Sequence, residues 1–163
     1  MRRVVLALVT GAVLLVLGVA QATATGTTYG FNLIGPNLAE NLGNGDVIRV
    51  TGSGEFNPSL RTASGSGSFT HRHGDGTLVA KGTWMATGFT GFDPYGGPTN
   101  GAQGGSVRIV VTLFPSGGGA VPSVPMVVTC HVGTVPGGAP EEGTQISAFT
   151  ESIGGLTLMH IVS

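Results

Sequence analysis

The stretch SGSGSFTHRHGDGTLVAKGTWMAT, residues 64–87, decides the fold because it predicts one long β-hairpin. Asp75-Gly76 separates two runs rich in Thr, Val, Phe and Trp, and Asp-Gly is a favoured hairpin turn because both residues tolerate a positive φ. Counting outward from this turn pairs four positions on the two arms: His73 with Leu78, His71 with Ala80, Phe69 with Gly82, and Gly67 with Trp84. The sequence therefore predicts two antiparallel strands in a fixed register.

One face of this hairpin is apolar and is predicted to point into the core. Successive side chains of a strand point to opposite faces, so this face carries Phe69, His71, His73, Leu78, Ala80, Gly82 and Trp84. The register also places the Phe69 ring opposite bare Gly82, which favours it over a slip by one residue. Such a slip would bury the charges of Lys81 and Arg72 without a partner.

Two histidines, His71 and His73, consequently lie on the predicted inner face. We interpret them first as rim residues beside the turn, or as core imidazoles satisfied by hydrogen bonds. The alternatives are residues that line a cavity and ligands of a transition metal. Spacing supplies no third ligand, although His131 or His160 would complete such a site.

The His-x-His pair resembles the first half of the metal-binding motif of cupins, which has a glycine, five residues, and then His-x-His and a glutamate. Gly65 stands six residues before His71, in the matching position. Thr77 and Leu78 occupy the places of the glutamate, and no second motif supplies a further histidine. The resemblance covers fewer than ten residues and implies a transition metal as the alternative to having no cofactor.

Cys130, His131 and Met126 invite a comparison with exported blue-copper proteins, which use two histidines, a cysteine and a methionine. Neighbouring strand residues point to opposite faces, so Cys130 and His131 cannot share a metal or form a nucleophile pair without a bulge. Cys130 is the only cysteine, which leaves the chain without an internal disulfide. We expect a plain buried thiol, and the sequence leaves its role open.

The N-terminus predicts an export signal. Two arginines follow Met1, and residues 4–20 form an apolar run. A signal peptide over residues 1–24 would be removed after Ala22 or Ala24, because both end small-x-small cleavage sites. The mature protein is then secreted or extracytoplasmic, in the periplasm or at the cell surface. An uncleaved N-terminal membrane anchor is the alternative, and it is the only membrane contact we expect.

The composition predicts that residues 25–163 form a single all-β domain. Removal of Arg2 and Arg3 leaves five basic residues against eight acidic ones, a net charge of −3, which argues against nucleic acid as a partner. Glycine occurs 30 times, and charged residues are 9% of the chain where about 25% is usual. Apolar alternation between the glycines indicates many turns rather than disorder.

About eight strands are predicted, and no convincing helix follows the signal helix. They cover residues 27–34, 46–56, the two hairpin arms as far as residue 89, 106–114, 124–132, 144–150 and 156–162. A Gly35-Pro36-Asn37 turn ends the first strand, and a polar loop over residues 38–45 follows. This pattern favours a small antiparallel β-barrel, with a two-sheet β-sandwich as the alternative.

Two features favour the barrel over the sandwich. Gly52 and Gly54 stand at successive inward positions, which predicts a bend or a close backbone approach. Lysine occurs once in the chain, so an open sheet would lack the charges that usually protect its edges.

The long loop predicted over residues 91–105 supplies two more candidates, Phe92 and Tyr95, because loops of this length are often functional. With His71, His73 and Trp84 they make up the candidate ligand-binding residues. We predict a non-enzymatic exported β-domain that binds a small apolar or amphiphilic ligand or acts at the cell surface, where a homo-oligomer is one partner to consider. The alternative is a metal-binding protein or metal-dependent enzyme that uses His71 and His73. No catalytic residue is predicted, because neither a nucleophile elbow nor a phosphate loop is present.

Overall fold

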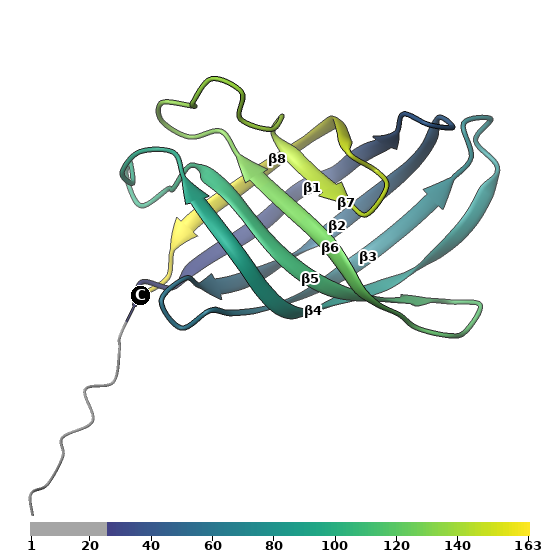
Figure 1. The fold of residues 1–163 in the computed structure, drawn as a ribbon, viewed down its shortest axis with the longest axis horizontal. Helices are drawn as coiled ribbons and strands as arrows, with labels where there is room; N and C mark the ends of the chain where they lie inside the picture. The colour runs from purple at the N-terminus through teal and green to yellow at the C-terminus, as the bar shows by residue number, and fades with distance from the viewer. Residues whose placement is uncertain (1–25) are drawn as a thin grey trace, which may run out of the picture.

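The computed structural model describes residues 26–163, so the predicted signal peptide and its cleavage sites at Ala22 and Ala24 lie outside the described residues. This part of the chain is all-β and folds into one antiparallel sheet that curls into a nearly closed barrel (Figure 1). Residues 26–163 hold no helix, and therefore no helical segment that could cross a membrane. The predicted barrel is confirmed.

Eight strands follow one another along the chain. They are β1 (Tyr29–Asn41), β2 (Asp46–Asn57), β3 (Thr62–Arg72), β4 (Leu78–Pro94), β5 (Gly105–Pro115), β6 (Val121–Cys130), β7 (Gly143–Ile146) and β8 (Glu151–Ile161). The sheet order is β7-β6-β5-β4-β3-β2-β1-β8, so each strand from β1 to β7 pairs with its neighbours in sequence and β8 pairs with β1. One sheet wraps around one core, which excludes the two-sheet sandwich.

The register of the central hairpin is confirmed away from its turn. Phe69 pairs with Gly82, as predicted, but a register shift after His71 pairs Arg72 rather than His73 with Leu78. The turn is longer than expected: Gly76 N donates to His73 O at 2.8 Å, and Gly76 alone takes a positive φ, 86°. A four-residue turn that ends on one left-handed glycine is another common hairpin solution. His73 and Leu78 are consequently exposed and do not lie on the inner face.

The predicted turn at Gly35-Pro36-Asn37 is instead a bulge inside β1. Pairing with β2 jumps from Leu33 to Asn37, and Gly35 takes a φ of 74°. The bulge places Pro36 where the ladder requires no N–H group, so the strand continues to Asn41. The polar loop predicted over residues 38–45 is therefore only a tight turn between β1 and β2.

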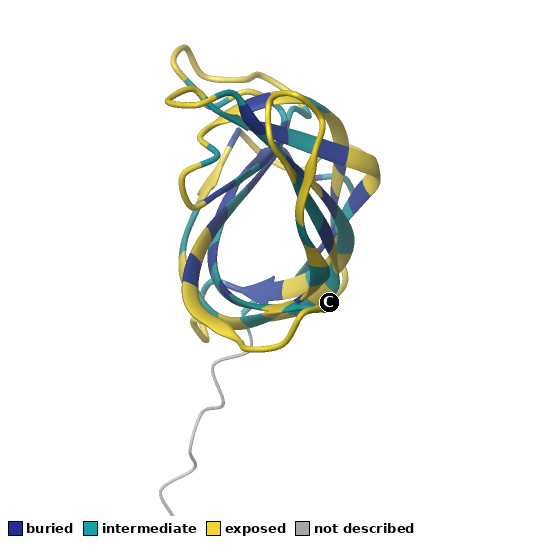
Figure 2. Cartoon of the chain, turned by 90° about the vertical axis from the view of Figure 1, so that its right-hand side faces the viewer, coloured by how far each residue is buried: buried dark blue, intermediate teal, exposed yellow. Residues whose placement is uncertain are grey.

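Apolar side chains from all eight strands fill the barrel interior, and β7 supplies Ile146. Buried members include Phe31, Leu33, Ile48, Val50, Phe56, Phe69, Trp84, Val107, Ile109, Val111, Met126, Val128, Cys130 and Met159. Figure 2 looks along the barrel and shows the strands closing around this single interior. A small barrel of eight strands has room for about this set of side chains, so the interior is a packed core.

Trp84 and the glycines opposite it explain the close approach predicted on the inner face. The Trp84 side chain is 1% exposed, and its Nε1 donates to Thr51 O at 2.9 Å across β3. A Cβ on Gly67 would stand 2.6 Å from Nε1, and one on Gly52 would stand 2.7 Å from the same ring. Phe31 covers Gly54 in the same way. Bare glycines therefore let aromatic rings lie flat against the sheet.

The barrel closes between β7 and β8 through side chains, and we call this junction the seam. Buried Asn37 donates from Nδ2 to Leu156 O at 3.3 Å and accepts from Thr144 Oγ1 at 3.3 Å. Thr157 N donates to Glu142 Oε1 at 3.1 Å. These bonds stand where a continuous backbone ladder would otherwise close the sheet.

Prolines protect the edge that β7 leaves open. β7 pairs with β6 only from Met126 to Thr129, and Ser147 N donates to Pro125 O, so the part of β6 before Pro125 pairs with β5 alone. Pro122 lies in this part, Pro125 directly follows it, and both lack N–H groups that another strand could bind. The chain thus obtains from proline the edge protection that its single lysine does not supply.

Candidate functional site

The two aromatic candidates from the predicted long loop are not exposed. β4 continues to Pro94, and Phe92 packs against Tyr29 and Phe56 with ring centroids 5.2 and 4.8 Å apart. Tyr95 is 5% exposed. The loop is shorter than the one predicted over residues 91–105, because β4 runs to Pro94 and β5 begins at Gly105. A role of Phe92 and Tyr95 in binding stays a prediction.

The two histidine candidates meet one carboxylate at the rim of the barrel. His71 Nε2 lies 2.8 Å from Asp46 Oδ2, and His73 Nδ1 lies 3.1 Å from Asp46 Oδ1. The hydrogen bonds from His71 and His73 lower the pKa of Asp46. Phe149 packs edge-on against the His71 ring, with centroids 5.0 Å apart. This cluster fastens the start of β2 to the end of β3.

The other two histidines lie at the opposite ends of the strands and do not join His71 and His73. His131 Nε2 lies 2.9 Å from Pro140 O, and the His160 ring covers Gly30. Within residues 26–163, no three His, Cys, Asp or Glu side chains are placed to hold a metal ion. The geometry consequently offers the metal alternative no site in this part of the chain.

Cys130 is a core residue on the inner face of β6. It is fully buried, and its Sγ donates to Thr157 O at 3.4 Å. Burial raises the pKa of the thiol, which keeps it protonated and unreactive. His131 lies beyond the end of β6 and bonds to the following loop, so the two residues do not act together.

A hollow of about 380 Å³ lies outside the barrel, between the β5–β7 face and the loop that joins β6 to β7, and we call it the outer pouch. Its lining consists of Asp93, Tyr95, Ser106, Arg108, Val127, residues 136–140 and Gln145. Strand pairing places Arg108, Val127 and Gln145 in one row across β5, β6 and β7. This row forms the floor of the outer pouch.

Hydrogen bonds hold the covering loop over the sheet at several points. Tyr95 lies beneath it, and its hydroxyl is 2.8 Å from Ser106 Oγ, which is in turn 2.8 Å from Thr129 Oγ1. His131 reaches Pro140 O from below, and Ser152 Oγ donates to Glu142 O at 2.7 Å. Pro140 and Glu142 both belong to the last residues of the loop, so the loop is fixed over the sheet near its end.

The outer pouch is apolar on one side and charged on the other. Val127, Pro136, Ala139 and Pro140 supply apolar surface. Opposite them Arg108 binds Asp93 through both guanidinium Nη atoms, with Nη2 at 3.3 Å from Oδ1. Hydrogen bonding to Arg108 lowers the pKa of Asp93, and the same bond raises the pKa of Arg108. Both groups are charged at neutral pH.

A glycine gives Arg108 the room to lie flat over the sheet. Gly91 pairs with Arg108 across the β4–β5 ladder, beside a register shift. A Cβ at Gly91 would stand 2.5 Å from Arg108 Nη2. The bare backbone therefore lets the guanidinium reach Asp93 along the wall of the outer pouch.

Of the predicted candidates, only Tyr95 lines the outer pouch. His71 and His73 lie at the rim with Asp46. Trp84 lies in the core, and Phe92 packs against Phe56. Sequence reasoning missed the remaining lining residues because they come from four strands and a loop, and no spacing in the sequence brings them together.

Comparison with known protein families, with curated proteins and with solved structures finds no match for this chain.

Proposed function

We propose that the protein is an exported, non-enzymatic binding domain whose outer pouch holds a small amphiphilic ligand. The observation that carries the proposal is the two-sided lining of the outer pouch, with Val127 and Pro140 on the apolar side and the Arg108–Asp93 ion pair on the other. Small-molecule sites are concave, largely apolar and supplied with a few polar groups that orient the ligand.

The size of the outer pouch limits the ligand to a small molecule. Its volume of about 380 Å³ lies near the lower end of the range of about 300–1,000 Å³ that such sites occupy. An apolar body would contact Val127, Ala139 and Pro140, while a polar head would hydrogen-bond to Gln145 and to the ion pair. The packed interior supports a site outside the barrel, because Trp84 and its neighbours already fill the space within.

The polar groups of the outer pouch favour binding over catalysis. A general base works best when its pKa is close to the working pH, whereas the bond to Arg108 lowers that of Asp93. The Tyr95 hydroxyl is tied to Ser106 and is buried. Neither group is arranged to take a proton from a bound molecule.

The proposal places the mature protein outside the cytoplasm, on the strength of the signal pattern in residues 1–24. Intact-mass analysis of the protein recovered from the medium or the envelope tests this part. A mature chain that begins at Thr23 or Thr25 is expected. A protein that retains Met1 and stays in the membrane fraction would show instead that the segment is an anchor.

Binding is tested with 1-octanol, octanoate and octylamine, which share one tail and differ in their head groups. Amide chemical shifts of the mature protein are followed by NMR during each titration. We expect at least one of the three to shift the amides of Val127, Gln145 and residues 136–140. No shift with any of the three at millimolar concentration would contradict the proposal.

A matched pair of variants locates the site. Val127 and Val110 both point outward from the sheet, on β6 and β5, and only Val127 lines the outer pouch. Val127→Trp should fill the outer pouch and weaken binding at least tenfold, while Val110→Trp should leave it unchanged. Equal affinity in the two variants would place the ligand elsewhere.

A further inference from the structure

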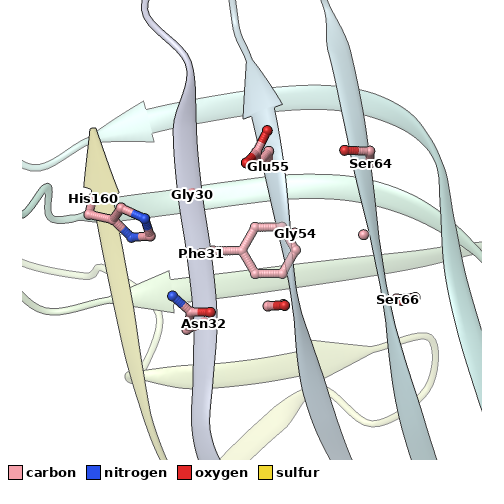
Figure 3. A pocket seen from close by; sticks show the side chains of 10 residues that line it. Gly30, Phe31, Asn32, Gly54, Glu55, Ser64, Ser66 and His160 are labelled. Atoms are coloured by element: carbon pink, nitrogen blue, oxygen red, sulfur yellow. The ribbon is translucent and has the colours of Figure 1, made fainter. Parts of the chain in front are cut away.

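A second hollow, of about 560 Å³, lies on the outer face of β1, β2 and β3 next to the end of β8, away from the outer pouch (Figure 3). Its polar side chains are Asn32, Ser53, Glu55, Ser64, Ser66 and His160. We call it the serine groove. Neither lysine nor arginine contributes to its lining.

The side chains of the serine groove stand in two rows that cross the strands. Glu55 pairs with Gly30 on one side and with Ser64 on the other, which forms the first row. Ser53 pairs in the same way with Asn32 and Ser66, which forms the second row. Neighbours within a row are about 4.7–4.9 Å apart, the spacing between strands. The groove thus offers polar groups at regular intervals across the sheet.

Gly30 contributes no side chain to the first row. The His160 ring leans over this glycine, and a Cβ at Gly30 would stand 2.6 Å from His160 Cε1 and 2.7 Å from Nε2. Figure 3 shows the imidazole of His160, on β8, turned toward Gly30 on β1, with Glu55 on β2. His160 Nδ1 is buried and has no hydrogen-bond partner among the described residues. The imidazole therefore lies over Gly30, and the Glu55 carboxylate stands on β2 beside it.

The polar groups of the serine groove are not used within the protein. Among residues 26–163, the side chains of Asn32, Ser53, Glu55, Ser64 and Ser66 form no hydrogen bond with another protein group. Further along the same two strands the situation differs, because Thr51 Oγ1 and Ser68 Oγ satisfy each other at 2.8 Å. The donors and acceptors of the serine groove are therefore open to groups from outside the protein.

We propose that the serine groove binds a neutral polyhydroxylated chain, a polysaccharide segment lying across β3, β2 and β1. Hydroxyl and amide groups can each both donate and accept, as the hydroxyls of a sugar chain do. The strand spacing is close to the length of one sugar residue, so successive rings can meet successive strands. Strand faces of other small barrels serve as oligosaccharide platforms.

The charges of the serine groove decide among classes of polymer. Glu55 is its only carboxylate, and without a nearby cation it would repel an anionic polysaccharide or a nucleic acid. The same carboxylate accepts hydrogen bonds from neutral hydroxyls, and bonds to a charged acceptor are the stronger kind. This site is independent of the outer pouch, and it would attach the exported protein to a neutral surface glycan.

The test uses three neutral hexasaccharides, cellohexaose, maltohexaose and chitohexaose, with heparin as the anionic comparison. NMR titration of the mature protein should show at least one hexasaccharide shifting the amides of Gly30, Gly54 and Ser64, and heparin shifting none of them. Absence of shifts there with all three neutral chains at millimolar concentration would overturn the proposal. Shifts confined to residues 136–145 would also overturn it, because they would place the sugar in the outer pouch.

A matched pair of variants on β3 completes the test. The double variant Ser64→Val/Ser66→Val removes two hydroxyls and should weaken the affinity about tenfold or more, as expected for the loss of two hydrogen bonds. Thr70→Val removes a hydroxyl from the same strand and face outside the serine groove and should leave the affinity unchanged. Equal affinity in both variants would overturn the proposal even if the wild-type protein binds the sugar.

Discussion

The interior of the barrel and the outer pouch both carry apolar side chains, yet they differ in what contacts those side chains. Inside, Trp84, Phe31 and their neighbours are almost fully buried and pack against bare glycines, so the protein itself supplies every contact. In the outer pouch, Val127 and Pro140 face a space of about 380 Å³ and an ion pair. The difference teaches that closing a sheet into a barrel does not by itself create a cavity, and that here a loop over the sheet does.

The largest change in the free energy of unfolding is expected at Trp84, where it tests whether the interior is packed. Trp84→Ala should lower the free energy of unfolding by about 3–5 kcal/mol, because it leaves a cavity and removes the bond to Thr51 O. Urea denaturation followed by circular dichroism measures it. Trp84→Phe keeps a ring in the core and should cost less. A loss below about 1 kcal/mol for the alanine variant would show that the interior is not packed.

The seam is expected to come next. Asn37→Ala removes both bonds of a fully buried side chain and leaves Leu156 O and Thr144 Oγ1 without that partner. The free energy of unfolding should fall by about 1–3 kcal/mol. Asn41→Ala makes the same change at the half-buried last residue of β1, where the Asn41 side chain accepts only from Gly43 N, and should cost less. Equal losses in the two variants would mean that the seam adds nothing to closure of the barrel.

Much of the interior could be predicted from the sequence, because it follows from local alternation. The pairing of Phe69 with Gly82 and the inward row on β5 both depend on a period of two and a nearby turn. The bulge at Pro36 could not be predicted, because the residues that signal a turn also fit a bulge when neighbouring strands continue past it. The predicted length of the hairpin turn was wrong for a similar reason, since Asp-Gly fits two kinds of turn.

The candidate sites were harder to predict because they depend on contacts between distant segments. The histidines lie beside Asp46 only because β2 pairs with β3 so that Ile48 faces His71, a register that short sequence patterns do not set. Tyr95 is buried because the loop after β6 folds over it. Distances along the sequence carry no information about either arrangement.

The smallest effect is expected at the rim, where acid should weaken the cluster of Asp46 with His71 and His73. The pKa of Asp46 is lowered in the folded protein, so its contribution to stability is present above the unfolded value of 3.8. That contribution is lost as the pH falls through the lower, folded value. Thermal unfolding between pH 2 and pH 6 should show a steeper acid loss for the wild type than for Asp46→Asn. Parallel profiles would show that the carboxylate does not stabilise the rim.

Fluorescence of Trp84, the only tryptophan, tests most directly whether the ligand stays outside the barrel. The wild-type protein is titrated with whichever eight-carbon probe shifts the outer-pouch amides, and Trp84 emission is recorded to saturation. The account predicts that the wavelength and intensity of emission stay constant while the amides of Val127 and Gln145 shift. A change in Trp84 emission that follows the same binding curve would place the ligand in the interior and contradict the account.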